Sequence, residues 1–153
     1  MREFYFVLIF ALILERLFEL RLSKRNQAEL LRRGYQFAEP SWQLGLMVAM
    51  HVLWFVALIF EPILFPQNIN HLLFCIALLG LLLAQILRVW TISTLGAEWN
   101  ISVMKPGNHA TADGGVIYNG PYKFLRHPNY LAVIMEFIFV PLLISATYTL
   151  LLF

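Results

Sequence analysis

The chain has 153 residues, of which 60% are hydrophobic and only 13% are charged, and its formal net charge is +2. A soluble domain usually has about a quarter charged residues and slightly under half apolar ones. This composition excludes an ordinary soluble enzyme, a disordered tail and a collagen-like chain, and it indicates a membrane protein. The small net charge gives no sign of a nucleic-acid partner, and one cysteine excludes a disulfide framework.

Four hydrophobic stretches predict an all-α integral membrane protein with about four transmembrane helices in a single domain. The stretches cover about residues 4–22, 41–60, 69–87 and 130–153. About twenty apolar residues cross a hydrocarbon core of ~30 Å, so each of the last three is long enough to span. Backbone groups in lipid must be paired within the segment, which favours helices. The first stretch meets charged residues from Glu15 onward, and we expect it to continue as an amphipathic surface segment to about Arg33.

Basic residues predict how these helices are oriented. Six of the eleven Lys and Arg residues fall between the uninterrupted apolar part of the first stretch, residues 4–14, and the second stretch, and four more fall between the third and fourth. The connection between the second and third stretches, residues 61–68, has none. By the positive-inside rule, both basic connections face the cytoplasm. We therefore expect a multi-pass protein of the cytoplasmic membrane.

The connection over residues 88–129 is the one long stretch that does not resemble a membrane span. Its glycines and prolines predict turns and exposed backbone. Loops of this length in a compact protein are usually functional or disordered. Aromatic and imidazole side chains argue against disorder here: Trp90, Trp99, His109, Tyr118, Tyr122, Phe124, His127 and Tyr130. We expect any site to lie in this cytoplasmic loop region.

The densest cluster of such residues runs from Gly120 to Tyr130, at the start of the last stretch. Pro128 suits the first turn of a helix, where its missing N–H costs nothing. Arg126 or His127 then lies at the cap, beside unpaired backbone donors and the positive end of the helix dipole. Such a place favours an anionic group, to which Arg126 offers a forked donor.

Glu136 is the one charge within the last stretch, seven residues after Asn129 and about 10 Å deeper along a helix. A carboxylate within a span normally faces a partner or a wet cavity. We predict that Arg126, His127, Asn129 and Glu136 line one polar pocket open to the cytoplasm. The alternative is that the residues flanking the span are interface anchors, with Trp99 and Tyr130 in an aromatic belt.

Other polar residues have simpler interpretations. Glu15 and Glu19, near Arg16, are predicted to form a structural ion-pair ladder at the interface. His51 is more simply a hydrogen-bonded packing histidine than a ligand. No pair of His, Cys or carboxylate residues has metal-ligand spacing, so we predict no metal, and no glycine-rich phosphate loop is found.

One family shares several of these motifs. The segments Leu95-Gly96, Trp99-Asn100, Gly120-Pro121-Tyr122 and Arg126-His127-Pro128-Asn129-Tyr130 resemble the isoprenylcysteine carboxyl methyltransferase family. Its members are integral membrane enzymes that use S-adenosylmethionine. The segments 19–26, 33–34 and 50–51 are similar to the bacterial branch, some of whose members methylate alkylpyrones instead of prenylated proteins.

The resemblance implies an S-adenosylmethionine-dependent O-methyltransferase acting on a lipophilic acceptor, a prenylcysteine carboxylate or an alkylpyrone-type hydroxyl, drawn from membrane lipid. It implies that the cofactor is bound by Tyr122, Arg126, His127, Asn129 and Tyr130. Arg126 suits the cofactor carboxylate, and the tyrosine rings suit its sulfonium. His127, Arg126 and Glu136 are the predicted catalytic residues, with His127 the candidate base for an enol acceptor.

The end of the chain departs from the family pattern. Family members continue with a polar segment carrying Glu and Arg that helps enclose the cofactor, whereas this sequence stops at Phe153 in apolar residues. We therefore expect these 153 residues to bind the cofactor weakly and turn over poorly.

Two alternatives remain open. An NADPH-dependent sterol-type reductase has a similar Arg/His-Pro-Asn-Tyr turn, but here the continuation 131–133 is Leu-Ala-Val and lacks the glycine and acid usual in those enzymes. The other alternative is a non-enzymatic membrane subunit.

Overall fold

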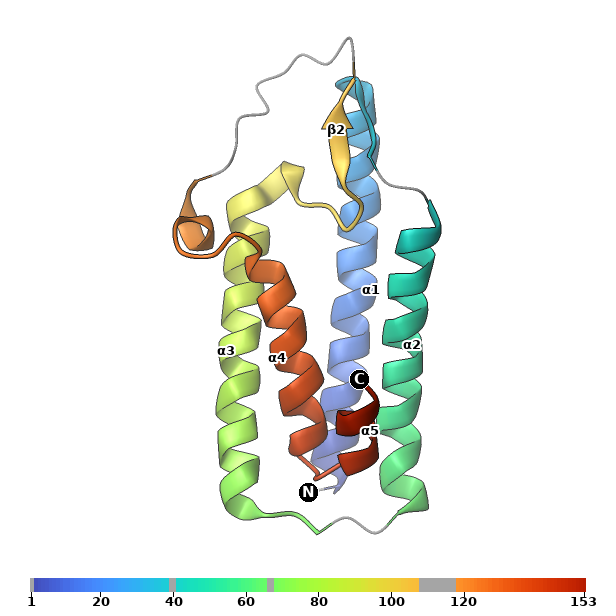
Figure 1. Ribbon diagram of the computed structural model, residues 1–153, viewed down its shortest axis with the longest axis vertical. Coiled ribbons are helices and arrows are strands. Elements are labelled where there is room, and N and C mark those ends of the chain that lie inside the picture. Colours follow the sequence, from blue (N-terminus) through green and yellow to red (C-terminus); the bar gives the residue numbers. More distant parts are fainter. Residues whose placement is uncertain (1, 39–40, 66–67, 108–117) are drawn as a thin grey trace.

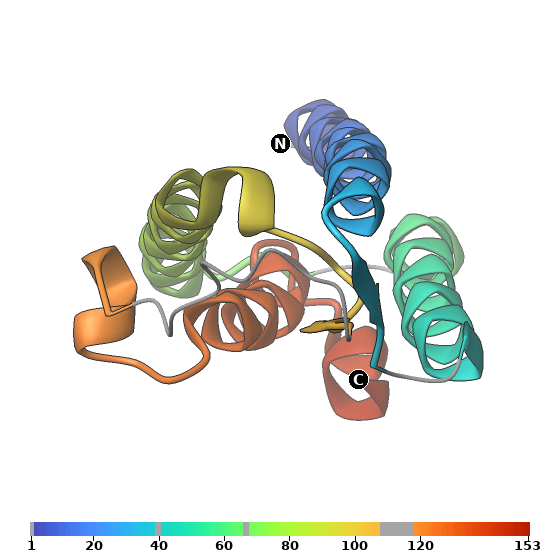
Figure 2. The same cartoon turned by 90° about the horizontal axis from the view of Figure 1, so that it is seen from above.

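The computed structural model describes residues 2–38, 41–65, 68–107 and 118–153. Four long helices form an up-and-down bundle, and a fifth, short helix folds back beside the last of them (Figure 1). The helices are α1 (Arg2–Arg32), α2 (Ser41–Leu64), α3 (His71–Leu95), α4 (Pro128–Leu142) and α5 (Thr147–Leu152). Seen from above, α4 lies between α3 and α5, and α1 and α2 stand side by side across from them (Figure 2).

Within the described residues, two helices are long and apolar enough to cross a membrane, and both fall where the sequence predicts spans. They cover Trp42–Leu64, within α2, and His71–Glu98, which begins with α3. The first stretch is one continuous helix of 31 residues, α1, without a break where its charges begin. The prediction that the helix continues to about Arg33 is therefore confirmed.

The third helix extends further than the sequence suggested. Asn70 caps its start by accepting from the backbone N–H groups of Leu72 and Leu73, and Gly96, with φ 53°, ends it. Arg88 therefore lies inside α3 and not in the loop region that was expected to begin with it. A guanidinium is tolerated at this place because it is paired, as the site below shows.

The predicted single span over 130–153 is wrong, because the chain reverses within it. Helix α4 has 15 residues and ends in a tight turn in which Ala146 N–H donates to Pro141 O at 2.9 Å and Ser145 N–H to Leu142 O at 3.2 Å. These two bonds form a Schellman motif, with Ser145 in the left-handed region at φ 58°. The turn gives the last carbonyls of α4 hydrogen-bond partners. After it, the chain starts α5 in a new direction.

Helix α5 is held against α2 by one buried carboxylate, Glu61. It accepts from the backbone N–H groups of Tyr148 at 3.0 Å and Thr149 at 2.7 Å, and from the Thr149 hydroxyl at 2.6 Å. These donors lie in the first turn of α5, where N–H groups lack helical partners and the dipole favours an anion. Glu61 therefore acts as a cap supplied by a neighbouring helix.

Helices α3 and α4 pack closely because small residues face the contact. Ala77, Gly80 and Ala84 are buried on α3. A Cβ added at Gly80 would lie 2.5 Å from the ring of Phe139 on α4, so no larger side chain fits there without displacing the ring. Small residues that let helix backbones approach are the usual packing device of membrane helices.

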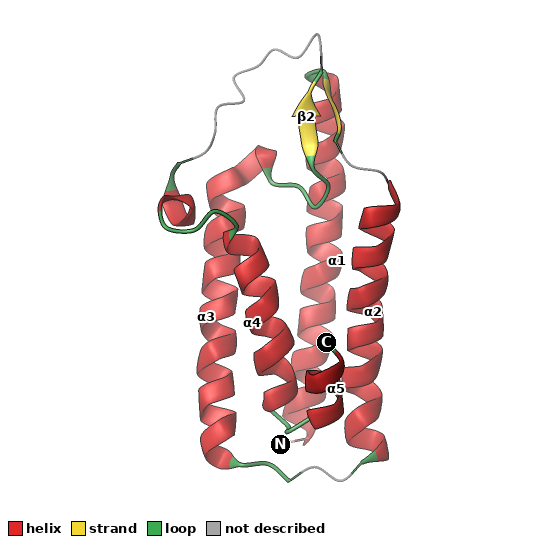
Figure 3. Cartoon of the chain, viewed as in Figure 1, coloured by secondary structure: helices red, strands yellow, loops and turns green. Residues whose placement is uncertain are grey.

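A short two-stranded sheet joins the two basic connections at one end of the bundle, and it corrects the all-α prediction. Strand β1 (Tyr35–Phe37) pairs antiparallel with β2 (Met104–Pro106), with Gln36 opposite Lys105 (Figure 3). Three-residue strands carry little periodicity in the sequence, and the pairing partners are far apart in the chain. The sheet fixes the connection after α1 to the connection after α3.

Replacing Glu61 with Ala should destabilise the fold by about 1–3 kcal/mol, because two backbone donors and one hydroxyl lose their buried acceptor. The measurement is unfolding in detergent micelles under increasing denaturant. Glu29→Ala is the matched control, since the Glu29–Arg33 pair is exposed and should contribute about 0–1 kcal/mol. Equal effects of the two substitutions would show that Glu61 does not hold α5.

Candidate functional site

A cavity of about 810 Å³ lies between α1, α2 and the start of α4, and residues of the two-stranded sheet contribute to it. Ligand pockets in proteins usually measure about 300–1,000 Å³. Its α1 and α2 walls are largely apolar, and the sheet and the segment 98–103 contribute to its lining. The side of the cavity next to α4 is mostly aromatic and polar. Its lining residues are Tyr122, His127, Asn129, Tyr130 and Val133.

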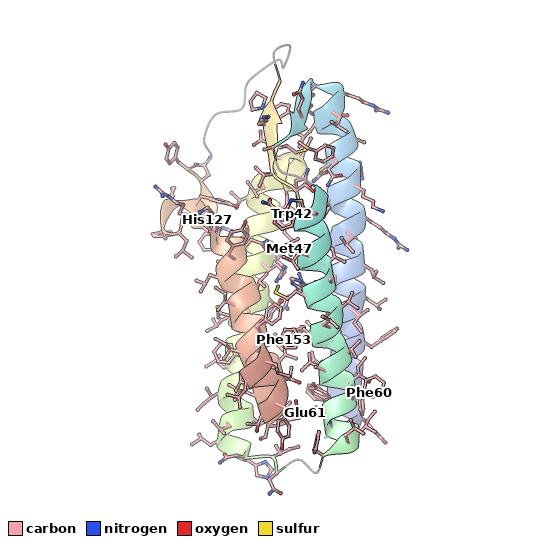
Figure 4. The ribbon with its side chains drawn as sticks, turned by 45° about the vertical axis from the view of Figure 1, so that its right-hand side comes forward. Trp42, Met47, Phe60, Glu61, His127 and Phe153 are labelled. Atoms are coloured by element: carbon pink, nitrogen blue, oxygen red, sulfur yellow. The ribbon has the colours of Figure 1, made fainter. Side chains whose placement is uncertain are left out.

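The start of α4 forms as predicted from the sequence. His127 is the N-cap residue and Pro128 occupies the first helical position. Among the described residues, no side chain caps the first turn, and the His127 ring instead stacks on Tyr130 with centroids 5.3 Å apart. Met47 on α2 and His127 are seen toward the same end of the bundle in Figure 4.

Tyr122 reaches the cavity from a short 3-10 helix, η2 (Gly120–Lys123). Gly120 has φ 58°, and a Cβ at this position would collide with the Thr94 side chain. Only glycine therefore allows this turn to lie directly on α3. Burial raises the pKa of the Tyr122 phenol, so the side chain is a neutral hydrogen-bonding group at physiological pH.

The segment after α3 is held to α1 by side-chain amides and a hydroxyl. Asn26 donates to the carbonyls of Gly96 at 3.1 Å and Trp99 at 2.7 Å. Ser23 and Gln27 donate to Asn100 Oδ1 at 2.6 and 2.9 Å. Trp99 is 2% exposed, which rules out the alternative that it belongs to an aromatic belt.

Two amide atoms near the cavity have no hydrogen-bond partner within the described part of the chain. They are Asn100 Nδ2 and Asn129 Oδ1, and both atoms are buried. Both residues line the cavity. A buried polar group without a partner costs free energy, and a bound ligand is one way to satisfy it.

Glu136 forms the centre of a buried ion cluster that joins three helices. Arg88 on α3 binds it in a forked arrangement, Nε to Oε1 at 3.0 Å and Nη2 to Oε2 at 2.8 Å. Arg16 on α1 donates to both of its oxygens at 2.9 and 3.1 Å, and Gln85 donates at 2.8 Å. Arg88 is only 1% exposed, so this pairing takes place away from water.

Glu19 completes the cluster by accepting from both arginines. Arg88 Nη1 lies 3.2 Å from its Oε1, and Arg16 Nη1 pairs with its Oε2. The predicted pairing of Arg16 with Glu19 is confirmed. The predicted position of the pair at the membrane interface is wrong, because Glu19 is buried. Glu15 is a weaker member, with its carboxylate 3.6 Å from Arg16.

This ion cluster shows that the predicted composition of the polar pocket is partly wrong. Of the four residues expected to line it, the structure brings His127 and Asn129 to the cavity, whereas Arg126 is exposed and Glu136 faces its guanidinium partners. A carboxylate in an apolar helix is stabilised most by cations, and α1 and α3 each supply one guanidinium. Arg16, Glu19 and Arg88 line the cavity instead. The sequence signals that Glu136 needs a partner, because a carboxylate within a span is costly, but it does not show which residues supply it.

His51 also lines the cavity, from the α2 wall. Its Nδ1 lies 2.8 Å from Met47 O, as expected of a hydrogen-bonded packing histidine. Its ring meets Phe137 of α4 edge-on, with centroids 5.3 Å apart, and Phe137 also contacts Trp54 at 4.6 Å. These rings connect α2 to α4 beside the cavity.

No group of three or more His, Cys, Asp or Glu residues within the described ranges is placed to hold a metal ion. His109, named from the sequence, lies outside the described residues.

The fold and the cavity define a mostly helical protein with two apolar, membrane-length helices and a ligand-sized cavity at one end. Residues 74–153 match the sequence profile of the isoprenylcysteine carboxyl methyltransferase (ICMT) family. Over 151 residues the chain is 33% identical to "Uncharacterized protein YpbQ" of Bacillus subtilis (strain 168), covering 97% of this chain and 84% of that protein. No solved structure matches the chain. The chain belongs to the ICMT family, whose members use S-adenosylmethionine.

Replacing Glu136 with Gln should lower the free energy of unfolding by about 3–5 kcal/mol, because Arg88 then keeps a buried charge with only part of its pairing. Denaturant unfolding in micelles measures the loss. Glu29→Gln removes an exposed pair and serves as the control. Wild-type stability of Glu136→Gln would show that the cluster does not hold α1, α3 and α4 together.

Proposed function

We propose that the protein is an S-adenosylmethionine-dependent O-methyltransferase that acts on a lipophilic acceptor at the cytoplasmic face of a bacterial membrane. The observation that carries the proposal is the composition of one cavity wall. Tyr122, His127, Asn129 and Tyr130, which the family motif associates with the cofactor, come from two separate elements and line the same cavity. Membership of the ICMT family supports the same chemistry.

The chemistry of this wall fits the cofactor. The rings of Tyr122, Tyr130 and His127 offer faces to a sulfonium cation. The unpartnered Asn129 Oδ1 is an acceptor for an amine or a hydroxyl of the ligand. The uncapped N-terminus of α4 suits a carboxylate, and the exposed Arg126 precedes it in the chain.

The apolar walls suit the acceptor. Leu17 on α1 and Val48 and Phe55 on α2 are among the apolar residues that line the cavity. A long hydrocarbon or prenyl tail gains free energy by lying against such surfaces. Prenylcysteine carboxylates and alkylpyrone-type hydroxyls both combine a tail of this kind with an oxygen nucleophile.

The residues of this chain have two tasks in the reaction, orientation and exclusion of water. When bound, S-adenosylmethionine would supply the methyl group for transfer to an acceptor oxygen. The stacked His127 and Tyr130 rings would stabilise the positive charge of the cofactor. The segment 98–103, held by α1, and the sheet line the cavity and would help to keep water from it.

Asn129→Ala should weaken S-adenosylmethionine binding by about 5- to 100-fold, corresponding to about 1–3 kcal/mol for a lost buried hydrogen bond. Calorimetry on the protein in micelles measures the affinity, with S-adenosylhomocysteine as competitor. Tyr118→Ala, an exposed aromatic residue of the same connection, is the control. Arg126→Gln tests the exposed guanidinium before α4 separately and should weaken binding of the cofactor carboxylate.

Saturable binding of NADPH in place of S-adenosylmethionine would contradict the proposal, as would equal S-adenosylmethionine affinity for the Asn129→Ala variant and the unchanged protein.

A further inference from the structure

His51 is held in one tautomer by its own helix. A backbone carbonyl only accepts hydrogen bonds, so the 2.8 Å contact with Met47 O requires the proton to be on Nδ1, which donates it. In the neutral ring, Nε2 then carries a free lone pair. This is the arrangement in which a histidine accepts a proton at Nε2 while its other nitrogen keeps the ring oriented.

The ring lies among apolar groups of the cavity lining. His51 is half-buried and shares the cavity-lining face of α2 with Met47, Val48 and Phe55. The edge-on contact with Phe137 restricts rotation of the imidazole. The ring is thereby placed in the cavity that also holds the proposed cofactor wall.

The nearby acidic groups are engaged with guanidiniums. Glu19, which lines the cavity from α1, accepts from Arg16 and Arg88, and Glu136 on α4, outside the lining, accepts from the same two side chains. These pairs direct both carboxylates toward the arginines. The remaining ionisable groups of the lining are Arg16, Tyr35, Arg88, Glu98, Tyr122, His127 and Tyr130. Of these, Glu98 and His127 are exposed, so His51 is the imidazole that lies deeper among apolar residues.

We propose that His51 is a catalytic base that takes the proton of a hydroxyl acceptor at Nε2. The inference rests on the proposed function and narrows its substrate to an O–H that keeps its proton at neutral pH, as a phenol does. The acceptor oxygen forms a bond to the methyl carbon, the sulfur–methyl electron pair returns to sulfur, and the O–H electron pair stays on oxygen as the proton moves to Nε2. The imidazolium then loses this proton to water. A carboxylate acceptor is already ionised and needs no base.

Substitutions at His51 distinguish the role of a catalytic base from that of a packing residue. His51→Gln keeps a polar group near the Nε2 position without basicity, His51→Asn keeps a donor for Met47 O, and His51→Phe keeps the ring contact with Phe137. With a long-chain alkylphenol as acceptor, all three should lower kcat by about 10²- to 10⁴-fold with little change in KM. With a prenylcysteine carboxylate as acceptor, which needs no base, the same variants should lower kcat much less than they do with the phenol. His71→Gln, exposed at the opposite end of the bundle, is the control.

A second measurement does not depend on turnover. In micelles, the ¹⁵N resonance of His51 Nε2 should move toward that of a protonated ring nitrogen when the alkylphenol is added, and should not move with its O-methyl ether. The inference is overturned if the alkylphenol shifts Met47 and Val48 signals while Nε2 stays unchanged, or if the alkylphenol does not bind. It is also overturned if His51→Phe keeps the wild-type kcat. Failure of the proposed function is distinct, because it would appear as absence of S-adenosylmethionine binding and of methyl transfer to either acceptor.

Discussion

The forked ion pair between Arg88 and Glu136 is the interaction on which the rest of the structure depends. Two charges taken out of water are costly, and only good geometry and further hydrogen bonds offset that cost. Here Arg16, Glu19 and Gln85 supply the additional partners. Because these five side chains come from α1, α3 and α4, the requirement to pair them fixes how the three helices lie against one another.

The cavity follows from this fixed arrangement. With α1 held at Arg16 and Glu19, the next turns of the same helix bring Ser23 and Asn26 to the segment after α3. That segment contributes Trp99 and Asn100 to the lining and continues into the sheet. The α4 side is positioned by the close contact at Gly80, so the residues of the family motif meet the α1 and α2 walls across one space.

Much of the molecule was predictable from patterns that are local in the sequence. Apolar length predicted α2 and α3, and a proline after a histidine predicted the start of α4 at Pro128. The turn at Ser145 was missed because its left-handed residue is not glycine and every neighbour is apolar or small. The partners of Glu136 were missed because pairing depends on which helices are adjacent, and one sequence shows the need for a cation without showing its source. His51 was interpreted as a packing residue, and only the cavity gives it a further role.

Transfer of a radiolabelled methyl group from S-adenosylmethionine into lipid extract tests the central claim most directly. Membranes containing the protein should incorporate label into a lipid-soluble product above membranes that lack it, and S-adenosylhomocysteine should suppress the incorporation. Asn129→Ala should reduce the incorporation, since Asn129 lies on the proposed cofactor wall. Incorporation no greater than in control membranes, at saturating cofactor, would contradict the account.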